Sequence, residues 1–147
     1  MFEQIQNTFS ARDSSLGRIC RHRSAPENSR LTRTSRQQDK LHLRPVILCK
    51  TCKSHITDSN QAIAVSTTHT HTFPNPFGLV FTIRCFASAP GCVTHGEASP
   101  DFSWFSGYDW QIVLCRGCSE HLGWKFCGND VFFGLIAAKL FEGKSAD

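Results

Sequence analysis

Two Cys-x-x-Cys pairs carry the plainest chemical signal in this sequence, Cys49 with Cys52 and Cys115 with Cys118. Each pair directly follows a short apolar run that is typical of a β-strand. A strand that leads into such a pair forms a zinc knuckle, whose tight turn places two thiolates on one edge of a coordination tetrahedron. Two knuckles complete one site, and the doubled motif favours zinc over two redox dithiols or chance pairs. The sequence therefore predicts one structural Zn²⁺ held by these four thiolates.

The other cysteines and histidines have no place in this motif. Cys85 and Cys127 lie among apolar residues and are expected to be small buried side chains. His55 and His121 each come three residues after a Cys-x-x-Cys pair, and we interpret them as outer donors or surface groups. The two histidines of segment 68–72 are expected to be hydrogen-bonded or solvent-facing instead of metal ligands.

A second signal is the aromatic stretch 102–126, which holds all three tryptophans of the chain and its single tyrosine. Trp104, Trp110 and Trp124 each lie close to a glycine or a predicted turn. Large aromatic residues usually belong to a core, but tryptophans beside turns can also form the walls of a pocket. Composition and spacing alone leave both readings open.

The elements that must position these residues are mainly strands. Runs 61–65 and 79–86 are rich in β-branched and aromatic residues and predict strands, and 75–78 predicts a turn between them. Only 131–141 has apolar residues at helical spacing, so a short helix is expected there. The expected fold is an all-β domain with a short C-terminal helix. A zinc ion would join two half-sites that are far apart in the chain, which fastens the ends of the domain together.

Charge and composition divide the chain in two. The net charge is +4, and seven arginines fall in the first quarter of the sequence. Residues 1–42 are rich in Arg, Ser, Thr and Gln, so they predict a disordered basic tail before a folded domain at 43–143. A solvated tail is favoured over a transit peptide or a basic arm for nucleic acid. The N-terminus does not resemble a secretory signal and no run is long enough to span a membrane, so a reduced, cytoplasmic setting is expected.

The order and spacing of the motifs resemble the CULT domain family, the ligand-binding modules of cereblon-like proteins. The resemblance covers about residues 45–141. The matching segments are Cys-x-x-Cys at 49–52, His-x-His-x-Phe-x-Asn-Pro-x-Gly at 69–78, Ser-Trp-Phe-x-Gly-Tyr-x-Trp at 103–110, Cys-x-x-Cys-x-x-His-Leu-Gly-Trp-Lys-Phe at 115–126 and Phe-Gly-Leu at 133–135.

This resemblance implies a β-tent, in which two antiparallel sheets are set at an angle and bound by zinc, with a cage of three tryptophans at one edge. The ligand-binding set that it implies is Asn75, Pro76, Phe102, Ser103, Trp104, Trp110, Trp124 and Phe126. The main chain at Phe102 and Trp104 would contact the ligand. Phe102 stands where a histidine is usual in the family, and Ser106 stands where a proline is common.

The function that the resemblance implies is binding without catalysis. The ligands would be cyclic imides, such as glutarimides, dihydrouracil-like or uridine-like rings, or a protein terminus that carries such a ring. The resemblance does not bring a Lon-like domain or a ubiquitin-ligase adaptor segment, and neither is expected in this chain. No membrane partner is expected.

Three other functions stay open at this stage. An aromatic cage also binds methylated ammonium groups, and Asp101 or Asp109 could supply the carboxylate that such a cage uses. B-type methionine-sulfoxide reductases share the β-tent and the double Cys-x-x-Cys site, and Cys127 is the cysteine that could serve as nucleophile. A zinc-ribbon that binds nucleic acid is not favoured, because the folded part lacks a basic stripe.

Overall fold

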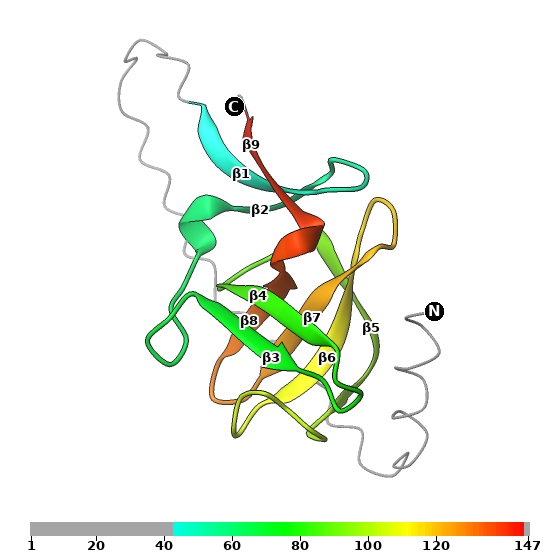
Figure 1. Ribbon diagram of the computed structural model, residues 1–147. Coiled ribbons are helices and arrows are strands. Elements are labelled where there is room, and N and C mark those ends of the chain that lie inside the picture. Colours follow the sequence, from blue (N-terminus) through cyan, green and yellow to red (C-terminus); the bar gives the residue numbers. More distant parts are fainter. Residues whose placement is uncertain (1–42, 146–147) are drawn as a thin grey trace, which may run out of the picture.

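The computed structural model of the protein describes residues 43–145. These residues form two antiparallel sheets, and their only helical segments are two short 3₁₀ turns, in agreement with the expected all-β fold and with the β-tent that the resemblance implies. The predicted disordered tail, residues 1–42, lies outside the described residues. Figure 1 shows the smaller sheet standing at one end of the larger one.

The smaller sheet has the strand order β2-β1-β9. Its strands are β1 (Arg44–Cys49), β2 (His55–Asp58) and β9 (Leu140–Ser145). The larger sheet has the order β3-β4-β8-β7-β6-β5. Its strands are β3 (Thr70–Pro74), β4 (Val80–Phe86), β5 (Cys92–Ser99), β6 (Asp109–Cys115), β7 (His121–Cys127) and β8 (Val131–Ile136). The first and last strands therefore pair with each other, and the larger sheet is built from the chain between them.

A hydrophobic cluster joins the two sheets. Ile47 of β1 and Ile56 of β2 are fully buried against Val113 of β6 and Leu122 of β7. Full burial of one such side chain stabilises the fold by about 1.5–3 kcal/mol. A second cluster lies beneath the aromatic residues of the larger sheet and includes Phe126. The two sheets thus share one core at their junction, and the larger sheet has a separate aromatic core.

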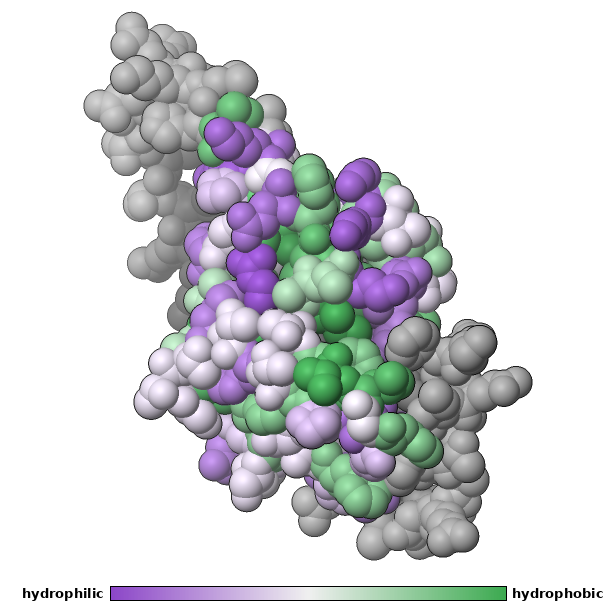
Figure 2. Space-filling view, viewed as in Figure 1, coloured by the Kyte–Doolittle hydropathy of each residue, from purple (hydrophilic) through white to green (hydrophobic). Residues whose placement is uncertain are grey.

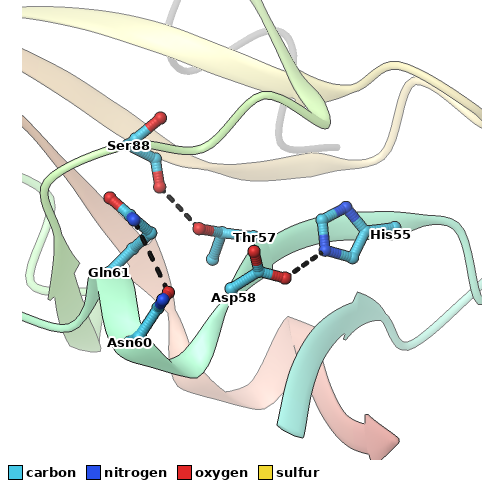
Figure 3. A network of polar contacts seen from close by, with 6 residues as sticks. All are labelled: His55, Thr57, Asp58, Asn60, Gln61 and Ser88. Carbon is cyan, nitrogen blue, oxygen red and sulfur yellow. Dashed lines mark hydrogen bonds and ion pairs between the residues drawn. The ribbon is translucent and has the colours of Figure 1, made fainter. Parts of the chain in front are cut away.

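A buried hydroxyl adds a polar link at the same junction. Thr57 of β2 is fully buried, and its hydroxyl donates a 2.6 Å hydrogen bond to the carbonyl of Ser88, which follows β4 (Figure 3). Figure 3 also shows His55 pointing toward Asp58, and their hydrogen bond is 2.8 Å long. The first strands of the smaller sheet are therefore tied to the larger sheet by a side chain that has no access to water.

The helix expected over 131–141 is wrong. This segment contains β8, a 3₁₀ turn at Ala137–Lys139 and the start of β9. Strand β8 is a central strand between β4 and β7, and both of its faces are buried, Leu135 in the cluster that joins the two sheets and Phe132 in the aromatic core. A strand that is apolar on both faces produces the same three- and four-residue spacings as a buried helix.

The strand expected over 61–65 is also wrong. It contains the end of a 3₁₀ turn, Ser59–Gln61, followed by two isolated bridges at Ala62 and Val65. Ile63 and Val65 pack on the aromatic core of the larger sheet. Their alternation reflects that packing, because no strand pairs with the segment along its length. In contrast, the strand expected over 79–86 and the turn over 75–78 are confirmed.

No helix within residues 43–145 is long and apolar enough to cross a membrane.

Candidate zinc site and aromatic cage

The four predicted ligand sulfurs meet at one point. Their Sγ atoms all lie within 4.8 Å of one another, and the Cys49–Cys118 and Cys52–Cys115 sulfurs are 3.7 and 3.5 Å apart. Tetrahedral Zn²⁺ with sulfur at 2.3 Å requires sulfurs about 3.8 Å apart. The thiolates are therefore already spaced as a zinc ion would hold them, which agrees with the sequence prediction.

The two zinc knuckles have the same backbone turn. In each, the first cysteine donates its N–H to the carbonyl five residues later and accepts the N–H four residues later. These hydrogen bonds are 2.9 Å long in the first knuckle and 2.8 Å in the second. The residue after the second cysteine, Lys53 or Ser119, has a φ of 62° or 61°. Both knuckles therefore place a non-glycine residue in the left-handed region.

The zinc site connects the two sheets. Cys49 ends β1 in the smaller sheet and Cys115 ends β6 in the larger one, and both are buried. The sulfur of Cys52 lies 3.0 Å from the Ser54 hydroxyl, and hydrogen bonds from the side chain and main chain of Ser54 lower the pKa of the Cys52 thiol to about 6. A thiol with such a pKa is ready to coordinate as a thiolate near neutral pH.

Gly117 of the second knuckle lies in close contact with Ser54 and Cys52 of the first knuckle. A Cβ at this position would lie 2.3 Å from the Ser54 hydroxyl oxygen and 3.2 Å from the Cys52 sulfur. A side chain at this position would displace the Ser54 hydroxyl, which contacts the Cys52 sulfur. The sequence pattern Cys-x-x-Cys does not reveal this constraint, because the residues that impose it belong to the other knuckle.

Within residues 43–145, the remaining cysteines and histidines lie outside the four-sulfur group. His69 and His71 hydrogen-bond to the main-chain carbonyls of Ile63 and Val65, as expected of non-ligands. His121 is half-buried, its Nε2 atom lies 3.0 Å from the Gly123 carbonyl oxygen, and desolvation of its ring lowers its pKa. Cys85 is buried as expected, whereas Cys127 is only half-buried.

A cavity opens at one end of the larger sheet, between β7 and the loop that follows β5. Its volume is about 80 Å³, whereas one water needs roughly 10–15 Å³ on the same measure. It therefore has room for a guest of several heavy atoms. The residues that line it are Asn75, Pro76, Phe77, Phe81, Asp101, Phe102, Trp104, Trp110, Trp124 and Phe126.

Strand pairing places the inner walls of the cavity. Trp124 and Phe126 are two residues apart on β7, so they face the same side of the sheet. Trp110 of β6 is the direct cross-strand partner of Phe126. The rings of Trp104 and Trp124 meet edge to face, with centroids 4.8 Å apart and planes at 76°. The indoles therefore stand as separate walls and are not stacked shut.

Two of the indoles are fixed by hydrogen bonds to the main chain. Trp104 Nε1 donates to the Pro74 carbonyl at 2.9 Å, and Trp110 Nε1 donates to the Asp101 carbonyl at 2.7 Å. Trp104 also stacks on Phe73, with ring planes 20° apart. These contacts hold the two indole rings in place.

The rim comes from two turns. Asn75 accepts the N–H groups of Phe77 and Leu79 on its side-chain oxygen, each at 2.9 Å, which holds the β3–β4 turn. On the opposite rim, Phe102 has a φ of 55°, a strained conformation for a bulky residue. Phe77 and Phe102 are 54% and 66% exposed. Figure 2 shows apolar residues gathered through the middle of the face in view, with hydrophilic residues beside them.

Seven of the eight residues that the resemblance implies as ligand-binding line this cavity. Ser103 does not, because its hydroxyl is directed to the Phe105 carbonyl at 3.0 Å. Phe77 and Phe81 line the cavity but were not in the expected set. Phe81 enters through the β3–β4 register, where it pairs with Phe73. That register is not visible in residue spacing, whereas the position of Phe77 beside Asn75-Pro76 was an available signal.

Comparison with known proteins agrees with this geometry. The family model described as Yippee zinc-binding/DNA-binding/Mis18, centromere assembly, matches residues 45–130. The protein cereblon of Drosophila grimshawi is 34% identical over 110 residues, which cover 67% of this chain and 16% of that protein. Cereblon of Drosophila melanogaster is 33% identical over 113 residues, which cover 69% of this chain and 19% of that protein.

The chain thus spans less than a fifth of the length of these relatives. The matched region contains both Cys-x-x-Cys pairs and the three tryptophans. A family of zinc-binding domains, four converging sulfurs and an aromatic cavity are consistent with one another. The chain belongs to the Yippee-Mis18 family, and within it the described residues form a zinc-binding, cereblon-like CULT domain.

Proposed function

We propose that this protein is a binding module that holds small cyclic imides in the aromatic cavity. The observation that carries the proposal is the character of the lining, in which aromatic rings predominate and Asp101 is the one charged residue. A flat, neutral ring matches such walls, because it loses water on both faces without leaving a charge unpaired. Glutarimides and dihydrouracil-like or uridine-like rings have this shape and neutrality.

The main chain at the rim supports the choice of an imide. A buried guest must have its polar atoms paired, because each unpaired group costs about 1–3 kcal/mol. Within residues 43–145, the main-chain N–H of Trp104 has no hydrogen-bond acceptor. It can donate to a ring carbonyl, while the nearby carbonyl of Phe102 would accept the imide N–H.

The lining also supports binding without catalysis. None of the ten lining residues is a cysteine, histidine, serine or lysine. Cys127 follows Phe126 on β7, so its side chain faces the opposite side of the strand from the cavity wall. A reductase of the methionine-sulfoxide type would need a thiolate beside its substrate.

A single observation favours a second candidate, the binding of methylated ammonium groups. Asp101 lines the cavity, and its carboxylate makes no hydrogen bond or ion pair within the described residues. A carboxylate beside aromatic faces attracts a cation. Asp109 is not among the lining residues, although the sequence made it as good a candidate for this carboxylate as Asp101.

Tryptophan fluorescence of the full, zinc-loaded chain tests both candidates, because all three tryptophans line the cavity. Glutarimide should change the emission saturably, and N-methylglutarimide, which lacks the N–H donor, should bind more weakly. Trimethyllysine is the competing guest. Binding of trimethyllysine without binding of any imide would replace our proposal with the second candidate. A peptide with a C-terminal cyclic imide, compared with its unmodified form, tests whether the guest is carried by a protein.

A further inference from the structure

A second cavity lies outside the aromatic cage. Three segments that are far apart in the chain line it, namely residues 63–66, the 104–108 loop and the residues that end the turn from β7 to β8. Its volume is about 400 Å³, within the roughly 300–1,000 Å³ of sites that hold small molecules. Among the described residues, Trp104 alone lines both cavities. The second cavity is therefore a separate place where a guest could bind.

The second cavity contains a carboxylate that is only partly used. Among the described residues that line it, Asp130 alone is charged. Its Oδ1 atom accepts a 2.6 Å hydrogen bond from the Tyr108 hydroxyl. This hydrogen bond raises the pKa of Tyr108, so the phenol stays protonated and acts as the donor. Within residues 43–145, no cationic side chain pairs with Asp130, and its Oδ2 atom has no hydrogen-bond partner.

Tyr108 brings an aromatic ring to the same carboxylate. Its side chain is half-buried, and its ring packs edge to face on the buried Phe132, with centroids 5.3 Å apart and planes at 71°. A cation bound to Asp130 would have this ring as a neighbour, and aromatic rings attract cations. A guanidinium suits such a pair best, because it is planar, stacks on aromatic rings and donates several N–H groups to a carboxylate.

A strained turn forms another wall of the second cavity. Val65 and Thr68 exchange two main-chain hydrogen bonds of 2.9 and 3.2 Å, and Ser66 and Thr67 between them have φ values of 48° and 81°. Tight turns with two positive φ values favour Asn and Gly, and a β-branched residue there is an outlier. His71 holds the turn, because its Nε2 atom lies 3.0 and 3.1 Å from the Val65 and Thr68 carbonyl oxygens. Strained residues that their surroundings hold in place cluster at ligand-binding sites.

We infer that the second cavity binds an organic cation with N–H donors, and that a guanidinium group on a short alkyl chain fits it best. The Oδ2 atom of Asp130 would accept the N–H groups of the guest. A quaternary ammonium has no N–H to donate, and a neutral imide brings no charge. The second cavity and the aromatic cage would therefore take different guests. This inference goes beyond the proposed function and does not depend on it.

The experiment compares N-butylguanidinium with N-butylurea, a neutral guest of nearly the same shape, on the full, zinc-loaded chain labelled with ¹⁵N. At low ionic strength the guanidinium should bind about 3- to 10-fold more tightly, between a surface ion pair and a shielded, charged hydrogen bond. It should shift the main-chain signals of residues 64–66 and 130–132. The indole signals of Trp110 and Trp124, which line the cage alone, should stay in place. Saturating glutarimide should not displace it.

Two matched variants test the carboxylate. Asp130→Asn should reduce the affinity for N-butylguanidinium to about that for N-butylurea. Glu97→Gln is the control, because Glu97 is an exposed carboxylate on β5 that lines neither cavity, and it should keep the preference. Circular dichroism checks that both variants are folded. The comparison of the two guests on the unaltered chain remains a test if Asp130→Asn does not fold.

A short peptide, acetyl-Gly-Arg-Gly amide, identifies the source of the guanidinium. Tighter binding of the peptide than of N-butylguanidinium would assign the guest to an arginine side chain of a partner, and weaker binding would assign it to a free small molecule. Equal affinities for guanidinium and urea, a preference that Asp130→Asn keeps, or displacement by glutarimide would each overturn the inference. None of these results decides whether the cage binds imides.

Discussion

A substitution at Gly134 of β8 should displace Phe126, which forms one wall of the cavity, without changing any lining residue. An added Cβ would lie 2.9 Å from Phe126 Cε2 and 2.8 Å from Ile83 Cδ1. Ordinary van der Waals contact begins at about 3.4 Å, so in Gly134→Ala the Phe126 ring must shift by about half an ångström. Phe126 is 1% exposed and packs on Phe105 and Phe132 as well as on the cavity. The cavity is the open space among these neighbours.

We expect two effects of Gly134→Ala. Overpacking of this kind costs about 1–3 kcal/mol, which for a domain of this size lowers Tm by roughly 5–20 °C. Displacement of one wall of an 80 Å³ cavity should also weaken glutarimide binding by about tenfold. Thermal unfolding followed by circular dichroism measures the first effect, and fluorescence titration at a temperature where both proteins are folded measures the second.

Gly143→Ala is the matched control. Its Cβ would lie as close to a neighbour, 2.8 Å from Leu48 Cδ1, but in the smaller sheet. It should lower Tm and leave glutarimide affinity unchanged. An unchanged Tm and affinity in Gly134→Ala, or an equal loss of affinity in both variants, would refute the reasoning that connects Gly134 to the cavity through Phe126.

Four further predictions test other parts of the structure. Chelation of zinc, or Cys118→Ser, should abolish cooperative unfolding near the native Tm, because the ion joins the two sheets; an unchanged melting curve would argue against a structural metal. Ser119→Gly should raise the unfolding free energy by up to about 1 kcal/mol by relieving a φ of 61°, and Ser119→Ala should not. The hydrogen bond to Asp130 raises the pKa of Tyr108, so the protonated form is favoured in the folded state and stability should fall as pH rises above about 10. Tyr108→Phe should flatten that fall in urea unfolding at pH 9 to 11. Asp101→Asn should weaken trimethyllysine binding and spare glutarimide; the reverse pattern would exclude a cationic guest.

Local motifs were the most predictable features. The zinc knuckles and the Asn75 turn are each closed by hydrogen bonds between residues two to five positions apart. All the residues that form such a short motif are neighbours in the sequence, so residue types and spacing suffice to recognise it. Resemblance to a family then extended the prediction to a cage, which residue spacing by itself had left open between pocket and core.

The secondary-structure predictions were wrong where one pattern of apolar residues fits both a helix and a strand, or both a strand and a loop. Segment 131–141 has helical spacing, yet its first part pairs with β4 and β7 as strand β8, and a different core cluster buries each face of that strand. Segment 61–65 alternates like a strand, yet it packs on the larger sheet without a partner of its own. Periodicity reports which side chains are buried and does not report which neighbours bury them.

By itself, the sequence determined the chemistry available to this protein, namely four thiolates in two knuckles and three indoles in one stretch. Tertiary structure decided how these groups meet. Pairing of β1 with β9 and closure of Gly117 on Ser54 bring the two knuckles together. The register between β3 and β4 places Phe81 in the cavity. These outcomes depend on contacts between segments far apart in the chain, and the free energy of such contacts is set by the packing of the whole sheet and not by local spacing.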